Sequence, residues 1–163
     1  MTVLAIDYGS SRVGLAISDE GEGIAMPLGT VQRAAGDVVA AVREALGERV
    51  VARVLVGLPL RLDGSEGDGA RRARAFGEKL GATLGVPVEY VDERFSTHHA
   101  TQRLDEVGVA GKDRRTMVDQ AAATVLLQGY LDSRNESPWS EEDMDKITSA
   151  EVAGAQRRRK KRR

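Results

Sequence analysis

The stretch VLAIDYGSSRVGLAISD, residues 3–19, decides the first part of the fold. It contains two apolar, β-branched runs, Val3–Tyr8 and Arg12–Ser18, separated by three turn-forming residues. So short a connection joins antiparallel strands, because parallel strands need a crossover of a dozen or more residues. A third extended segment, 24–32, follows a second turn at 19–23. The sequence therefore predicts a three-stranded antiparallel meander.

Helical and strand patterns alternate along the next part of the chain. Apolar residues recur at helical spacing or form short buried-strand runs in this order: helix 37–46, strand Arg53–Leu58, helix 69–84, strand 88–91, and helices 97–107 and 116–131. Strands joined through helices pair in parallel by right-handed crossovers. The expected fold class is α/β, with a five-stranded mixed sheet, made of the three-strand meander plus two parallel strands, and helices on both faces.

Composition excludes several classes of protein. The chain has 163 residues, of which 41% are hydrophobic and 30% charged, values typical of one globular domain. No apolar run approaches the length of a membrane span, and the first residues lack the charged start of a signal peptide, so we expect a cytoplasmic protein. The absence of cysteine excludes thiolate metal sites, and two histidines offer few other ligands. Any metal must be held by carboxylates.

Charge is distributed unevenly. Residues 1–131 carry a net charge of −3, residues 132–156 carry −5, and the run RRRKKRR at 157–163 carries +7. We expect one folded domain at 1–132, followed by an acidic and then basic, largely disordered tail at 133–163. Clustered cations of this kind favour contact with a nucleic-acid backbone, although a role in solubility alone is the alternative.

Three acidic residues lie where a ligand site is expected. Asp7 ends the first strand, and Glu93 follows the last one, so both lie where ligands bind in open α/β sheets. Asp119 shares a helix face with apolar residues, where an uncompensated charge would be costly. Each also has a structural interpretation: Asp7 could close a turn, Glu93 could pair with Arg94, and Asp119 could pair with an arginine such as Arg12 or Arg94.

Four segments of the chain then indicate a family. They are DYGSSRVGLAISD (7–19), GLPLRLDGSEG (57–67), VDERFSTHHA (91–100) and VDQAAATVLLQGYL (118–131). In this order they resemble the YqgF family of pre-16S rRNA nucleases, which is related to the RuvC-type Holliday junction resolvases. The resemblance covers residues 3–132. It implies an RNase H-like fold, a divalent metal site of three carboxylates and hydrolysis of phosphodiester bonds.

The resemblance also assigns residues. The acids of the family fall on Asp7, Glu93 and Asp119, which makes these the expected catalytic and metal-binding residues, with Mg²⁺ or Mn²⁺ suited to oxygen ligands. Residues expected to contact substrate carry hydroxyl or cationic groups: Ser10, Arg12, Arg94, Thr97, Lys112, Arg114 and Arg115, the last three placed before the final helix. A solvated helix start is the alternative for that basic cluster, and helix capping for Thr97.

The sequence departs from the resolvase pattern at two places. Related resolvases have a glutamate at the end of the fourth strand, where this chain reads Gly57-Leu58-Pro59, so the second acid must come from Glu93, one strand farther out. They also carry a further aspartate where Ala122 stands. We therefore expect three acidic ligands and a looser second metal position. Ser96 replaces the first of two threonines of the family and keeps its hydroxyl.

The expected function is that of a divalent-metal-dependent nuclease that processes the 5′ end of pre-16S rRNA during ribosome biogenesis. Resolution of Holliday junctions in DNA is the alternative, and it calls for two active sites on one dimer. A nucleic-acid-binding module without catalysis is the second alternative. Chain length disfavours an ATPase of the actin-like superfamily, which needs two such domains. The partner is thus RNA, or branched DNA, bound by a monomer or homodimer, with Phe95 as a candidate for base stacking.

Overall fold

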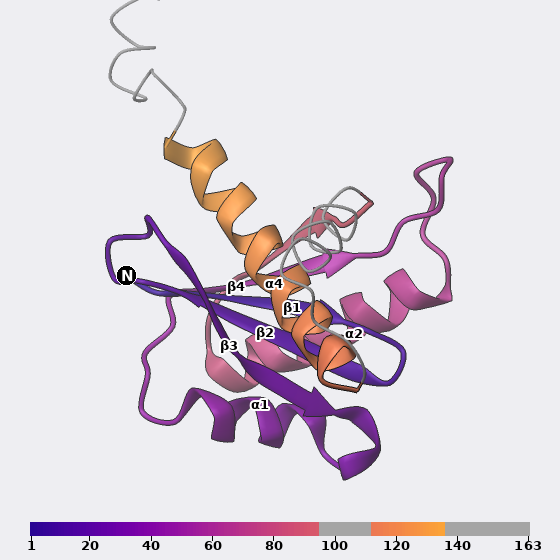
Figure 1. Ribbon diagram of the computed structural model, residues 1–163, viewed down its shortest axis with the longest axis horizontal. Coiled ribbons are helices and arrows are strands. Elements are labelled where there is room, and N and C mark those ends of the chain that lie inside the picture. Colours follow the sequence, from indigo (N-terminus) through magenta and orange to yellow (C-terminus); the bar gives the residue numbers. More distant parts are fainter. Residues whose placement is uncertain (95–111, 136–163) are drawn as a thin grey trace, which may run out of the picture. The chain divides into compact units, whose positions relative to one another are not determined.

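A computed structural model of the chain describes residues 1–94 and 112–135, with only the backbone described for 112–119. Residues Met1–Asp132 form one compact unit. Its centre is a five-stranded mixed sheet with the strand order β3-β2-β1-β4-β5 (Figure 1). No helix in these described ranges is long and apolar enough to span a membrane.

The antiparallel meander forms as predicted. Strands β1 (Val3–Tyr8), β2 (Arg12–Ser18) and β3 (Ala25–Gln32) are joined by tight turns, and β3 begins one residue later than expected. The β1–β2 register pairs Tyr8 with Val13, directly beside the turn. The first turn therefore presents its residues at the end of β1.

Two parallel strands extend the sheet beyond β1. Strand β4 (Arg53–Leu58) pairs with β1, and β5 (Val88–Asp92) pairs with β4. Both of these pairings are parallel, so β1, β4 and β5 all end at the same edge of the sheet, which we call the carboxyl edge. Asp7 and Glu93 are thereby brought to one edge, as the sequence predicted.

One face of the sheet is covered by two helices. Helix α1 (Val38–Leu46) begins after Asp37, whose carboxylate accepts a hydrogen bond from the amide of Val39 at 3.0 Å. Helix α2 (Asp68–Leu84) lies close to the sheet, since a Cβ on Gly81 would clash with the side chain of Val88. A short 3₁₀ helix, η1 (Arg33–Ala35), precedes α1. These helices enclose the larger hydrophobic core.

Helix α4 (Lys112–Asn135) covers the opposite face (Figure 1). Its buried apolar residues pack on β1, β2 and β4 in a second core, made of Ala123, Leu126, Leu127 and Leu131 against Val3, Ala5, Ala16 and Leu55. Helices therefore lie on both faces, which confirms the predicted fold class. The helix is longer than the predicted 116–131, and the helix predicted at 97–107 lies outside the described residues.

The start of α4 corrects one expectation. Lys112, Arg114 and Arg115 were predicted to precede this helix, but they lie within its first turn. Lysine and arginine are good helix formers, and the prediction missed them because it relied on apolar periodicity, which they lack. Asp113 is likewise part of its first turn.

Candidate active site

Asp7 lies on the face of the sheet that α4 covers. Side chains alternate along β1, so that Leu4 and Ile6 join the core under α1 and α2, while Val3 and Ala5 join the core under α4. The same alternation assigns Asp7 to the α4 face. The residue paired with Asp7 on β2 is Gly14, which has no side chain to cover the carboxylate. Asp7 is thus partly buried at the carboxyl edge.

Glu93 is buried and reaches back across β4. Its amide donates a hydrogen bond to the carbonyl of Leu58 at 3.1 Å, which continues the β4–β5 pairing beyond Asp92. Only 9% of Glu93 is exposed. Its side chain lies over Gly57 so closely that a Cβ there would be 2.5 Å from Oε1 and 2.8 Å from Cδ. Glu93 thereby reaches a hydrogen bond with Asp7, two strands away from β5.

This contact explains the departure at Gly57. The resemblance implies a glutamate of the related resolvases at the end of the fourth strand, where this chain reads Gly57, Leu58 and Pro59. The space next to Gly57 is occupied by the carboxylate of Glu93, which follows the neighbouring strand β5. Glu93 therefore reaches Asp7 although β5 lies one strand farther out, because Gly57 has no side chain in the way.

The electrostatics of this pair are unusual. Burial raises the pKa of Glu93 to about 9, and the hydrogen bond and negative charge of Asp7 act in the same direction, with a further contribution from Asp92. Two carboxylates in contact cannot both be ionised without a compensating cation, so at neutral pH a proton neutralises Glu93. A divalent cation would supply the same compensation. Two adjacent carboxylates are also the hard oxygen donors that Mg²⁺ and Mn²⁺ prefer, so the pair fits the expected metal.

Asp119 is only partly placed. Its backbone lies in α4, one turn before Ala123 and two turns before Leu126, both of which pack on the sheet face that carries Asp7. Its side chain lies outside the described part of the structure. Among the side chains that are described, no group of three or more acidic or histidine residues could hold a metal ion. The structure thus brings Asp7 and Glu93 together, and Asp119 as the third ligand stays a prediction.

Asp92, the acid beside Glu93, has a different partner. Arg94 binds it through Nε at 2.7 Å and through its own amide at 3.0 Å, and these hydrogen bonds lower the pKa of Asp92. The local acid–arginine pair foreseen for this segment therefore forms with Asp92 and leaves Glu93 directed at Asp7. The role of Arg94 in substrate contact stays a prediction.

Arg33 organises the turn after β1 and was missed by the sequence reasoning. Its guanidinium donates to the carbonyls of Gly9 at 3.1 Å and Ser10 at 2.6 Å, and lies 4.7 Å from the ring centre of Tyr8. Its amide donates to the carbonyl of Ser11. The one available signal was the strand register, because Arg33 follows the end of β3 opposite the turn. We call these contacts of Arg33 with residues 9–11 the Arg33 clamp. They fix the turn that follows Asp7 and carries the exposed Ser10.

The other predicted substrate contacts are placed to different degrees. Arg12 begins β2 and is partly buried at the same edge of the sheet. Lys112, Arg114 and Arg115 lie on the first turn of α4, with side chains that are not described. Thr97 and Phe95 lie outside the described residues. Contact of any of these residues with substrate stays a prediction.

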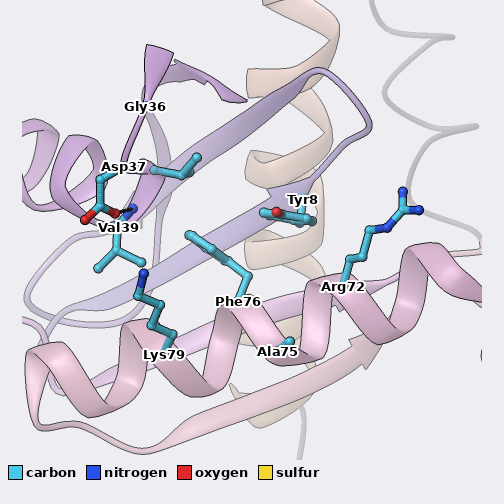
Figure 2. A pocket seen from close by; sticks show the side chains of 9 residues that line it. Tyr8, Gly36, Asp37, Val39, Arg72, Ala75, Phe76 and Lys79 are labelled. Atoms are coloured by element: carbon cyan, nitrogen blue, oxygen red, sulfur yellow. Dashed lines mark hydrogen bonds between the residues drawn. The ribbon is translucent and has the colours of Figure 1, made fainter. Parts of the chain in front are cut away.

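A separate cavity lies on the other face of the sheet (Figure 2). Its volume is about 630 Å³, and Phe76 and Lys79 point into it from α2. The ring of Tyr8 stacks on Phe76 with ring centres 4.8 Å apart. Since Tyr8 and Asp7 point to opposite faces of β1, this cavity is distinct from the acid pair.

Known proteins share both the sequence and the fold. Residues 1–133 match the family described as "RuvX: Holliday junction resolvase". A protein of Anaeromyxobacter dehalogenans named "Putative pre-16S rRNA nuclease" is 47% identical over 82% of this chain and 98% of its own length. A protein of the same name from Myxococcus xanthus is 42% identical over 82% of this chain and 89% of its own length.

A solved structure of Thermus thermophilus RuvC matches with a TM-score of 0.51 at 21% identity, covering 82% of this chain and 96% of that one. A second structure of T. thermophilus RuvC, in complex with a Holliday junction, matches with a TM-score of 0.50 at 17% identity, covering 84% of this chain and 98% of that one. These likenesses confirm the RNase H-like fold. Together with the family match and the two relatives, they lead to one conclusion: the chain belongs to the RuvX (YqgF) family, as its four motifs predicted.

Proposed function

We propose that this RuvX-family nuclease hydrolyses phosphodiester bonds at the 5′ end of pre-16S rRNA with the help of Mg²⁺ or Mn²⁺. The observation that carries the proposal is the contact of buried Glu93 with Asp7 across Gly57. Two acids buried against each other need a compensating positive charge. They lie at the edge where ligands bind in this kind of sheet, which supports a cation site there.

The acids of this chain would hold the metal. Asp7 and Glu93 would be two ligands, and Asp119 would complete the set from α4. Glu93 must give up its proton when the metal binds, because a ligating carboxylate is ionised. When bound, the metal supplies activation of water and neutralisation of the charge that develops on the phosphate oxygens.

Other residues of the chain would position the phosphates. The Arg33 clamp fixes the turn that carries Ser10, and Arg12 follows at the start of β2. Small residues in a fixed turn let a phosphate approach the backbone, and a guanidinium binds phosphate oxygens in a bidentate way. Lys112, Arg114 and Arg115 on the first turn of α4 would add cationic contacts. Such contacts fix the register of the substrate without reading its sequence.

The choice of RNA over branched DNA is supported by the names of the relatives, which are pre-16S rRNA nucleases. The family description favours junction resolution as the second candidate. The two differ in their need for symmetry, since paired nicks in a four-way junction require two active sites related by a twofold axis. An RNA processing nuclease can act as a monomer.

The test offers full-length protein two substrates side by side: an RNA that spans the 5′ end of 16S rRNA with its precursor, and a four-way DNA junction. We expect cleavage of the RNA in Mg²⁺ or Mn²⁺, none in EDTA, and a loss of orders of magnitude in D119N. Paired symmetric nicks in the junction by a dimer in solution would favour the resolvase. Binding of nucleic acid without cleavage of either would favour a module without catalysis and overturn the proposal.

For residues 133–163 we propose a role in binding, separate from cleavage. Seven cations at 157–163 should add affinity for any polyanion, with a slope of about 0.7 to 0.9 in log affinity against log salt for each phosphate neutralised. A chain that ends at Asp132 should then show a flatter slope and unchanged turnover at saturating substrate. Equal slopes with and without the tail would assign it to solubility or to a protein partner.

A further inference from the structure

The cavity lined by residues of α1 and α2 lies back to back with the acid pair (Figure 2). Tyr8, the last residue of β1, lines it, whereas Asp7 directs its carboxylate to the opposite face of the sheet. The Cα atoms of two such neighbours are only about 3.8 Å apart. The cavity, which we call the α1–α2 groove, therefore reaches the same carboxyl edge as the acid pair.

The floor of the α1–α2 groove is apolar and aromatic. Val39 and Phe76 are buried in the core, and the partly buried ring of Tyr8 stacks on Phe76 with ring centres 4.8 Å apart. The volume of about 630 Å³ lies in the range of pockets that hold small organic ligands. The groove is thus large enough for a flat ring and has the surface that such a ring prefers.

The basic residues of α2 fall into two kinds. Arg71 and Arg74 form ion pairs with acidic residues of the same segment. The side chains of Arg72 and Lys79 form no hydrogen bond or ion pair with any described residue, and both line the groove. Phe76 lies between them on one helix face, so cation, ring and cation follow one another over about 10 Å. The cations that face the groove are therefore available to an anionic ligand.

Among the described residues that line the groove, Asp37 is the one that is acidic. Its Oδ1 caps α1 by accepting hydrogen bonds from the amides of Val39 at 3.0 Å and Ala40 at 3.3 Å. The positive end of the helix dipole compensates the charge of an aspartate at this position. Its second oxygen can accept a hydrogen bond, and a nucleoside offers amino and hydroxyl donors. Asp37 is therefore compatible with a ligand that carries phosphate.

We propose that the α1–α2 groove binds a single-stranded segment of the RNA substrate that passes over the carboxyl edge from the acid pair; the inference rests on the proposed function. Unpaired strands are held by aromatic side chains that contact bases and by cations that contact the phosphates. The order of Arg72, Phe76 and Lys79 matches the order of phosphate, base and phosphate along such a strand. A second copy of the chain fits less well, because a twofold interface would set these cations against themselves.

The position of the groove makes RNA length and pairing important. A strand that occupies both the acid pair and the groove has to turn around the end of β1. A single strand can follow this path, whereas bending a regular duplex so sharply costs free energy. RNA that carries an unpaired segment long enough to reach both faces should therefore bind more tightly than shorter RNA.

Binding in EDTA tests the cations without any cleavage. The anisotropy of labelled single-stranded RNA is measured with full-length protein at several salt concentrations. Each phosphate contact to a single strand contributes about 0.7 to the slope of log affinity against log salt, so R72Q/K79Q should lower the slope by about 1.4. Its affinity at about 0.1 M salt should fall on the order of tenfold. The control R43Q/R71Q removes the same charge from exposed positions of α1 and α2 outside the groove and should match the wild type.

The aromatic floor is tested by blocking the groove and by crosslinking. Ala75 is exposed and lines the groove, so A75W should fill it and weaken binding of long RNA, while A40W adds the same bulk outside the groove and should not. RNA that carries 5-bromouridine is irradiated with the wild type, and the crosslinked peptides are mapped. We expect a crosslink in the peptide that contains Phe76, and its loss in A75W. Short RNA should give neither the crosslink nor the added affinity.

Three outcomes would overturn the groove as an RNA site. One is equal affinity and salt slope for R72Q/K79Q and R43Q/R71Q, with no crosslink at Phe76. Another is a mononucleotide that protects the groove while the affinity for RNA is unchanged in R72Q/K79Q, which would identify a free nucleotide as the occupant. A third is a dimer that A75W dissociates without any effect on RNA binding, which would identify a second copy.

Failure of the proposed function is a separate result. A wild type that shows the crosslink and the salt effect but never cleaves RNA would remove the nuclease role and leave the groove as a binding site. A wild type that cleaves RNA while the groove variants behave like their controls would retain the nuclease and remove the groove.

Discussion

Two acidic residues at opposite edges of the same sheet show how this fold separates structure from function. At the edge where β1 begins, Asp19 accepts hydrogen bonds at 2.8 Å from the amides of Gly23 and Ile24, which lower its pKa. At the carboxyl edge, burial and Asp7 raise the pKa of Glu93 to about 9. A carboxylate that accepts hydrogen bonds from backbone amides closes a turn, and its negative charge needs no further compensation. An acid buried against another acid needs a proton or a cation, and so marks the site.

The largest effect on activity is expected for D7N. The substitution keeps the shape of the side chain and removes the charge that would hold the metal. Because a catalytic metal contributes several kcal/mol and 1.4 kcal/mol corresponds to tenfold in rate, we expect cleavage to fall about a thousandfold or more. RNA binding should change little, and the melting temperature in EDTA should stay equal or rise. Activity above a tenth of wild type would contradict the assignment of Asp7.

The second substitution, G57A, tests the path that Glu93 takes. A new Cβ would lie 2.5 Å from Oε1 of Glu93, so the carboxylate must move away from Asp7. Displacement of a ligand or its support typically costs 10- to 100-fold in activity, and we expect a loss in about that range. G29A is the control, because a Cβ at Gly29 meets nothing within 4 Å. Equal activity of both variants would show that the contact across Gly57 is dispensable.

The third prediction concerns pH in the absence of metal. The pKa of Glu93 is about 9 in the folded chain against 4.5 as its ordinary value, so between these two pH values the folded state binds a proton that the unfolded state has released. The free energy of unfolding should therefore fall as pH rises from about 4.5 to about 9. Melting temperatures in EDTA across this range should decline more steeply for the wild type than for E93Q. Parallel curves would refute the raised pKa.

D19A should have the smallest effect on catalysis. It removes the carboxylate that accepts two backbone amides, so the melting temperature should fall by a few degrees while cleavage stays at the wild-type level. Because the pKa of Asp19 is lowered in the folded state, its contribution to stability is present at neutral pH and lost as pH falls. D19A should accordingly make the melting temperature depend less on pH in the acid range, whereas E93Q should do so between pH 4.5 and about 9. Loss of activity in D19A would remove the distinction between the two edges.

The sequence allowed much of the fold to be predicted, because its signals are local. Strands β1, β2 and β4 have the predicted bounds, since each is an apolar run between turn residues. The placement of Asp7 and Glu93 at one edge followed from parallel pairing. Their contact could not be predicted, because it depends on a side chain that is absent at Gly57. Arg33 was missed because its role arises only from the register of β3 against β2.

The strand order also determines when the site can exist. The meander of β1, β2 and β3 joins segments that are neighbours in sequence, whereas β1 meets β4, and β4 meets β5, only through long crossovers. Local contacts form faster than distant ones, and a growing chain folds from the part that emerges first. Asp7 is synthesised with the first strand of the sheet, whereas Glu93 follows the last strand and is synthesised much later. A chain that lacks β5 and the residue after it carries no acid pair, so the proposed metal site can be complete only when nearly all of the sheet has been made.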